Sequence, residues 1–250
     1  MRSPDNFKWG LSQSVFMAII LGFTFFRLGF SQSDVIGRAG LLFFIPIQNS
    51  FGVLFPIIVF LPMYNGILVR ERRTGAYRVS TYLLSRYSVE IPVAVVSRLP
   101  FFVLIYWLVP PIKKSKADVN LLFRMCNFKP AAGPFFIFVA INALTVLLAI
   151  TMGLFVGSLS TKLAIVQAIA PPMNVIFILF AGFLLPLPSI PDWFIWIHWI
   201  SYATYVFAGL TINELKGLQF DCPPAPESQC YASGQQFLDV YGLERVRVLF

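Results

Sequence analysis

The chain has 250 residues and a formal net charge of +8, with 58% hydrophobic and 12% charged residues. Its mean hydropathy of +0.76 is too high for an ordinary soluble domain and indicates an integral, multi-pass membrane protein. The apolar residues form long runs rather than ten-residue alternating segments, which predicts an all-α membrane protein, a polytopic helical bundle. The basic residues flank these runs and fit an anionic membrane surface, so we do not expect a nucleic-acid partner.

Five apolar runs are long enough to cross a bilayer, which takes about 20 residues. We expect these spans at about residues 9–28, 39–63, 91–109, 133–158 and 163–187. Pro46, Pro56 and Pro62 lie in the second run, where they predict kinks or helix ends. The third run contains Arg98, which we expect to snorkel or to pair with Glu90 rather than to bind substrate.

A polar segment from Gly66 to Pro92 separates the second and third spans. It contains four consecutive charges at residues 70–73, and Ala76, Val79, Leu83 and Tyr87 then recur at spacings of three and four. This periodicity predicts an amphipathic helix along the membrane interface, with its basic end in water. The residues alone leave two roles open: a surface for a partner protein, or a solvated connector attached to anionic lipid.

Residues 193–213 are uncharged but crowded with Trp and Tyr, which prefer the level of the lipid headgroups. They predict an interfacial or re-entrant helix pair, or alternatively a sixth span. His198 lies among three of these Trp residues and has no second His as a co-ligand, so we expect an interfacial residue and no metal site. The polar tail from Gln219 ends as if another apolar segment were about to begin, and we expect the chain to be C-terminally truncated.

Three separate blocks of this sequence resemble one known family. They are NGILVRERRTGAYRVSTYLLSRYSVEIP, FAGFLLPLPSIPDWFIWIHWISYATYVFAGLTINELKG, and the tail elements FDCPP and QCYASGQQFLDVYGLERVRV. Together they resemble the membrane domain of G-subfamily ABC transporters, the White and pleiotropic-drug-resistance type, also described as an ABC-2 type transmembrane domain. The blocks occur in the family's order and cover most of the chain.

The resemblance implies a membrane-spanning subunit or fragment of an ATP-driven exporter for a hydrophobic or amphipathic substrate, such as a lipid, sterol or xenobiotic. The chain contains no G-x-x-x-x-G-K-[ST] motif, so ATP and Mg are expected in a nucleotide-binding domain outside it, and no cofactor in this chain. The expected partners are that domain, the lipid bilayer and a second transmembrane domain in a homo- or heterodimer, and the expected location is the plasma membrane. The alternative is a non-ATPase channel or scaffold, or a degenerate fragment that does not transport.

The resemblance also implies roles for individual residues. The segment at about 67–87 would be the connecting helix, which contacts the nucleotide-binding domain through Arg70, Glu71, Arg72, Arg73 and Arg78. The substrate cavity would lie between two such domains and be lined by Asn49, Phe51, Gly52, Asn174, Val175 and Ile178. Phe183, Leu184 and Leu185 would form the external gate, although relatives begin this gate with Leu rather than Phe.

Three further expectations concern the loops. The re-entrant helices would occupy about 192–212 and an external loop about 213–245, with a disulfide between Cys222 and Cys230. Basic residues are equally frequent in the loops after the second and third spans, so charge alone does not set the orientation. The resemblance makes the Arg70 loop cytoplasmic, and residues 110–126 would be a lineage insertion or retained intron sequence.

Overall fold

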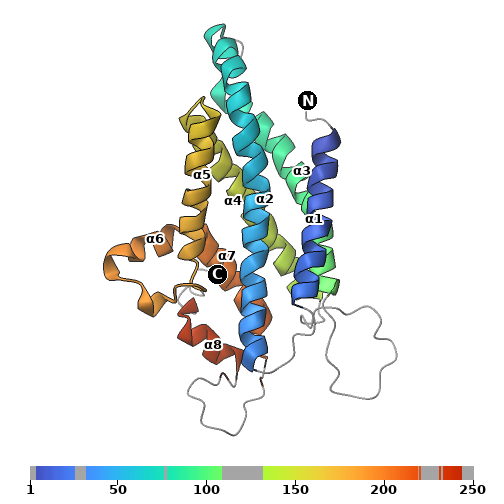
Figure 1. Cartoon of the computed structure of the whole chain (residues 1–250), viewed down its shortest axis with the longest axis vertical. Helices are drawn as coiled ribbons and strands as arrows, with labels where there is room; N and C mark the ends of the chain where they lie inside the picture. The colour runs from blue at the N-terminus through green and yellow to red at the C-terminus, as the bar shows by residue number, and fades with distance from the viewer. Residues whose placement is uncertain are drawn as a thin grey trace.

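A computed structural model of the chain describes residues 4–25, 32–75, 78–108, 132–218, 220, 231 and 233–243. Every regular element in these ranges is helical, which confirms the predicted all-α fold. The α-helices are α1 (Pro4–Thr24), α2 (Gln32–Arg73), α3 (Val79–Leu108), α4 (Ala132–Leu159), α5 (Leu163–Leu179), α6 (Ile195–Ile200), α7 (Tyr202–Leu215) and α8 (Gly234–Val240), with short 3-10 turns at Leu187–Ser189 and Asp192–Phe194. Figure 1 shows α1 to α5 running along the long axis of the molecule, with α6, α7 and α8 around its lower half.

Helix α2 is the central element of the bundle. Its 42 residues continue through Pro46, Pro56 and Pro62, and its charged C-terminal end projects beyond the other long helices (Figure 1). Glycines of α4 allow α4 to pack closely against it, because a Cβ on Gly157 would lie 2.5 Å from a methyl group of Leu61. Small residues at such contacts are a common way for membrane helices to associate.

Three helices in the described residues are long and apolar enough to cross a membrane: Asp34–Pro62 of α2, Ser80–Tyr106 of α3 and Gly133–Leu159 of α4. Helix α5 is apolar but has 17 residues. The segments Asp192–Ile200 and Tyr202–Leu215 would together make a fourth candidate, but they meet at a bend of 73°. The helical bundle is therefore clear, while the number of spans is three or four by length and composition alone.

The chain lies near the N-terminal half of α2 both before and after the bent pair. Before it, the ring of Phe183 lies 4.9 Å from the ring of Phe43; after it, Leu215 packs in one cluster with Val35. Between these points, Tyr202 at the start of α7 contacts Ser50, which lies farther along α2. The chain thus runs along α2 and back again, and the bend of 73° is compatible with a broken span as well as with a re-entrant pair.

The boundaries of several predicted elements differ from the observed helices. Where the sequence predicted one connecting helix at 67–87, the chain is helical to Arg73, turns, and is helical again from Val79. Gly75 in this turn has a φ of +73°, a backbone conformation that glycine adopts without strain. Helix α5 ends at Leu179, where the predicted span ran to 187. The proposed insertion at 110–126 and the pair Cys222 and Cys230 lie outside the described residues.

Candidate functional site

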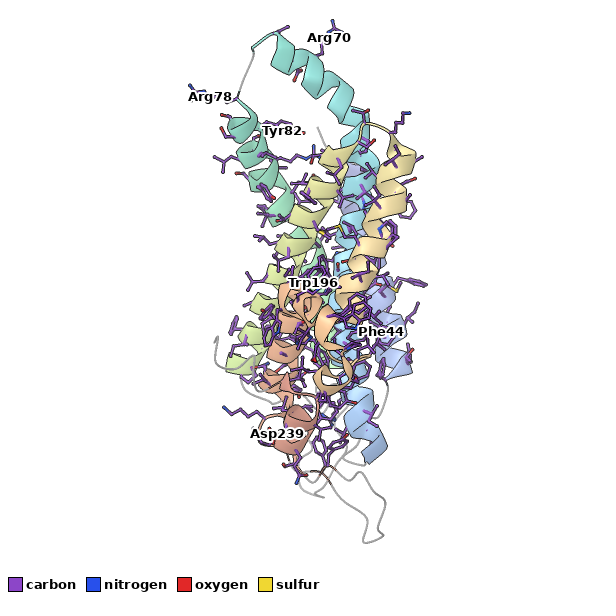
Figure 2. The ribbon with its side chains drawn as sticks, turned by 90° about the vertical axis from the view of Figure 1, so that its left-hand side faces the viewer. Phe44, Arg70, Arg78, Tyr82, Trp196 and Asp239 are labelled. Carbon is purple, nitrogen blue, oxygen red and sulfur yellow. The ribbon has the colours of Figure 1, made fainter. Side chains whose placement is uncertain are left out.

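The charged end of the α2–α3 hairpin lies beyond the apolar part of both helices. Arg70, Glu71 and Arg78 are exposed there, and Figure 2 shows Arg70 and Arg78 at the tip of the molecule. The hydroxyl of Thr74 donates a hydrogen bond of 2.7 Å to the carbonyl of Glu71, which closes the last turn of α2. Arg72 and Arg73 belong to this turn, but their side chains are outside the described part of the chain. The tip therefore offers charged groups that a protein surface could bind.

The first of the predicted cavity residues, Asn49, is fully buried inside this chain. Its Nδ2 donates a hydrogen bond of 3.1 Å to Oδ1 of Asn142 on α4, and Asn142 in turn donates to the carbonyl of Phe138. Asn49 therefore joins α2 to α4. In this arrangement its amide does not face the open surface where a second chain could meet α2.

Phe51 and Val175 are the predicted cavity residues that keep substantial exposed surface. Phe51 is half-buried and its ring stacks on Phe55 at 5.7 Å, while Val175 of α5 is 50% exposed. Ile178 is buried, and the hollow that it lines between α2, α5 and α7 measures about 10 Å³. That volume is at the lower limit for a single water molecule. This hollow is therefore too small for a substrate molecule.

Asn174 belongs to a buried polar cluster that joins three helices. Its Oδ1 accepts hydrogen bonds from Ser50 Oγ on α2 at 3.0 Å and from Tyr202 OH on α7 at 2.5 Å. The two hydroxyl oxygens are 2.6 Å apart. Because the hydroxyls carry two protons between them, two of these three contacts can be hydrogen bonds at one time. The sequence analysis named Asn174 as a site residue but not Ser50 or Tyr202. The sign of these two residues in the sequence was a polar group inside or beside an apolar run.

The predicted gate residues lie in the turn that follows α5. Gly182 has a φ of +97°, and after it Phe183 packs against Phe43 and against Phe207 at 5.7 Å. Leu184 is 54% exposed and Leu185 is half-buried. Phe183 is therefore held by contacts within the chain, whereas the side chain of Leu184 is largely exposed.

His198 holds this turn in place. Its Nδ1 lies 2.9 Å from the carbonyl oxygen of Phe180, which also accepts a hydrogen bond of 3.1 Å from the hydroxyl of Thr204. The side chain is buried rather than interfacial. Within the described ranges, no group of three or more His, Cys, Asp or Glu side chains is placed to hold a metal ion. We therefore assign His198 a structural contact at the end of α5.

A cleft that the sequence did not predict lies between α1, α2 and α3. Its volume is about 640 Å³, and its walls include Phe16, Phe55 and the buried Arg98. The expected pairing of Arg98 with Glu90 is not the one observed, since Glu90 binds Arg86 with an N–O distance of 3.3 Å.

Comparison with known proteins identifies a family model and several curated relatives. The family model described as ABC-2 type transporter matches residues 1–215. Among curated relatives, ABC transporter G family member 1 of Dictyostelium discoideum is 28% identical over 221 residues, which is 88% of this chain. ABC transporter G family member 7 of Arabidopsis thaliana is 30% identical over 98% of the chain, and Multidrug resistance protein CDR2 of Candida albicans is 31% identical over 85%.

The chain covers only part of each of these relatives: 26% of the first, 31% of the second and 13% of the third. The match to the family model nevertheless includes all five predicted spans and most of the described helices. It confirms the family that the sequence blocks resembled. The chain is an integral membrane protein and belongs to the ABC-2 type transporter family, with ABC transporters of the G family among its relatives.

Proposed function

We propose that the chain is the membrane-spanning part of an ATP-driven exporter that moves a hydrophobic or amphipathic substrate across a membrane, with the plasma membrane as the expected location. The observation that carries this proposal is the ABC-2 family match over residues 1–215. The ATPase would reside in a nucleotide-binding domain outside this sequence. A lipid, sterol or xenobiotic is the substrate class that a Phe-rich cavity favours.

The substrate cavity of this proposal lies between two copies of the domain, or between this domain and a related one. Two observations support it: the hollow between α2 and α5 in one chain is only about 10 Å³, and the neighbouring Phe55 and Val175 are about half exposed. Large apolar side chains that stay exposed along two neighbouring helices are typical of surfaces that another chain or lipid covers. Phe51, half-buried and stacked on Phe55, would present an aromatic face to a flat ligand there.

The nucleotide-binding domain would bind the tip of the α2–α3 hairpin. Arg70 and Arg78 are exposed at this tip on either side of the turn, so they can contact an acidic surface together (Figure 2). Helix α2 runs unbroken from the tip past Pro62 and Pro56 to Asn49, so a displacement of the tip would be transmitted along one helix, with these prolines as the positions where it can bend. The gate residue Leu184 would close the cavity on the opposite side of the membrane.

Reconstitution of the full-length protein tests this function. In proteoliposomes with a fluorescent lipid or dye, we expect ATP-dependent transport, and we expect the double charge reversal Arg70→Glu with Arg78→Glu to abolish transport while some ATPase activity remains. The matched control is Lys162→Glu, a charge reversal at an exposed residue before α5. ATP-independent flux, or loss of membrane attachment as the sole effect of the reversals, would favour the channel or scaffold alternative.

A further inference from the structure

Arg98 is a buried cation in the apolar C-terminal part of α3. Its side chain is 3% exposed, and its Nε is buried without a hydrogen-bond partner. A guanidinium group in a membrane interior is costly unless anions or carbonyls bind it, so such residues usually face a partner or a water-filled cavity. The nearest carboxylate on the same helix, Glu90, is two turns away and is bound to Arg86. A ligand is therefore the missing partner to consider.

The surrounding helices leave space for this guanidinium group. Gly52 of α2 lies directly against it, because a Cβ on Gly52 would be 2.5 Å from Nη1 of Arg98. Any larger residue at this position would push the guanidinium group away from α2. On the other side, Arg98 lines the cleft of about 640 Å³ between α1, α2 and α3. This volume is within the range of ligand sites, roughly 300–1,000 Å³.

The walls of the cleft combine apolar and polar side chains. Phe16, Phe55 and Val59 line it together with the exposed Ser12 and Gln13, and with Glu90, whose carboxylate is paired with Arg86. Phe16 and Phe55 are both exposed on the outside of the bundle, so the cleft is open sideways. A ligand with an anionic head and a hydrocarbon chain fits this lining, with its head at Arg98 and its chain along Phe16 and Phe55.

The position of Arg98 along the bundle points to a membrane lipid. Ser97, its neighbour, packs against Gly10 of α1, since a Cβ on Gly10 would lie 3.7 Å from Cβ of Ser97. Gly10 follows Lys8 and the highly exposed Trp9, a pair typical of the membrane interface. Arg98 is thus within one or two turns of the interfacial end of α1, and its long side chain is within reach of headgroups.

We propose that the cleft between α1, α2 and α3 is a binding site for an anionic phospholipid, whose phosphate binds Arg98 and whose acyl chain packs against Phe16 and Phe55. A planar guanidinium group binds phosphate through two parallel hydrogen bonds, which lysine cannot reproduce. This inference does not depend on ATP-driven export, because the site is formed within one chain. Removal of the lipid would leave the guanidinium group buried without an anion.

The test measures lipid binding to the purified full-length protein by native mass spectrometry and, in parallel, its thermal unfolding in detergent. We expect phosphatidylserine to be retained at least tenfold more tightly than phosphatidylcholine and to raise the unfolding temperature. Arg98→Gln should abolish this preference, because a charge-assisted pair in a buried site accounts for a factor of ten or more in affinity. Lys162→Gln removes the same charge from an exposed position and should leave the preference unchanged.

Gly52→Ala provides a second test that keeps Arg98 in the chain. The added methyl group should displace the guanidinium group and weaken phosphatidylserine binding, whereas Gly133→Ala, where a Cβ would meet no atom within 4 Å, should not. Equal retention of phosphatidylserine and phosphatidylcholine, or an unchanged preference in Arg98→Gln, would overturn the proposal. So would stabilisation by inorganic phosphate alone to the same extent as by phosphatidylserine, because the site would then bind a free anion.

Discussion

Replacement of Tyr202 by Phe tests whether the buried polar cluster stabilises the bundle. The substitution removes one hydroxyl group and leaves the ring in place. Tyr202 is within 2.6 Å of both Asn174 Oδ1 and Ser50 Oγ, but its single proton supplies one hydrogen bond. After the change, the hydroxyl of Ser50 still donates to Asn174. The net loss is therefore one hydrogen bond rather than two.

The magnitude follows from this proton count. Hydrogen bonds between membrane helices average about 0.6 kcal/mol, and those in protein interiors contribute about 0.5–1.5 kcal/mol. We expect Tyr202→Phe to lower the free energy of unfolding by about 1 kcal/mol, measured by titrating the purified protein with a denaturing detergent. Combined with Asn174→Ala, the two changes should be non-additive, because both remove the same contact. Tyr205→Phe is the matched control, since its exposed hydroxyl binds the carbonyl of Trp199 and water can replace it.

Two outcomes would refute this reasoning. If Tyr202→Phe and Tyr205→Phe changed the unfolding free energy equally, burial of the cluster would not matter. If Tyr202→Phe and Asn174→Ala were additive within about 0.3 kcal/mol, the two side chains would act independently, despite a separation of 2.5 Å between their polar atoms.

Five further substitutions test the packing of the bundle and the turn after α5. Gly157→Val should lower the free energy of unfolding by about 1–3 kcal/mol, because its side chain would overlap Leu61, and Leu61→Ala should recover part of that loss. Phe183→Ala should lower the free energy of unfolding by about 2 kcal/mol, less than the loss of a fully buried Phe side chain would. Leu184→Ala should leave this free energy nearly unchanged and instead increase substrate leakage through the proposed gate. His198→Ala should lower the free energy of unfolding by about 1 kcal/mol, because the carbonyl of Phe180 keeps its contact with the hydroxyl of Thr204. The same titration with a denaturing detergent measures these losses.

The fold class and the family could be predicted because both depend on long stretches of sequence. Apolar runs of the length of α4 identify helices in lipid without any knowledge of their partners. The break in the predicted connecting helix was harder to foresee, since the periodic apolar residues continue across it and the turn depends on the φ of Gly75. The three prolines of α2 predicted kinks or helix ends, and the helix ends at none of them.

The internal contacts of the candidate site could not be predicted, because they join residues far apart in sequence. Ser50 is 124 residues from Asn174 and 152 from Tyr202. A single sequence shows that such groups are polar, but not which of them meet. The cleft beside Arg98 depends in the same way on how three helices are spaced, and on the absence of a side chain at Gly52.

Three contacts between α2 and polar side chains of its neighbours lie within one turn of the helix, and this has a mechanical consequence. Asn49 binds α4, Ser50 binds α5 and α7, and Gly52 lies against Arg98 of α3. Successive residues of a helix are rotated by about 100°, so these three positions point in different directions and connect α2 to its neighbours on several sides. Arg70 is 18 residues farther along the same continuous helix, about 27 Å away.

A force applied at that tip would therefore act on all of these contacts together. If a nucleotide-binding domain moves the tip, α2 must carry its neighbours with it or break the contacts at this level. The first alternative requires less free energy, because the second leaves buried amide and hydroxyl groups without their partners. We therefore expect the bundle to move largely as a unit, with the change in shape concentrated between chains, where Phe55 and Val175 are exposed.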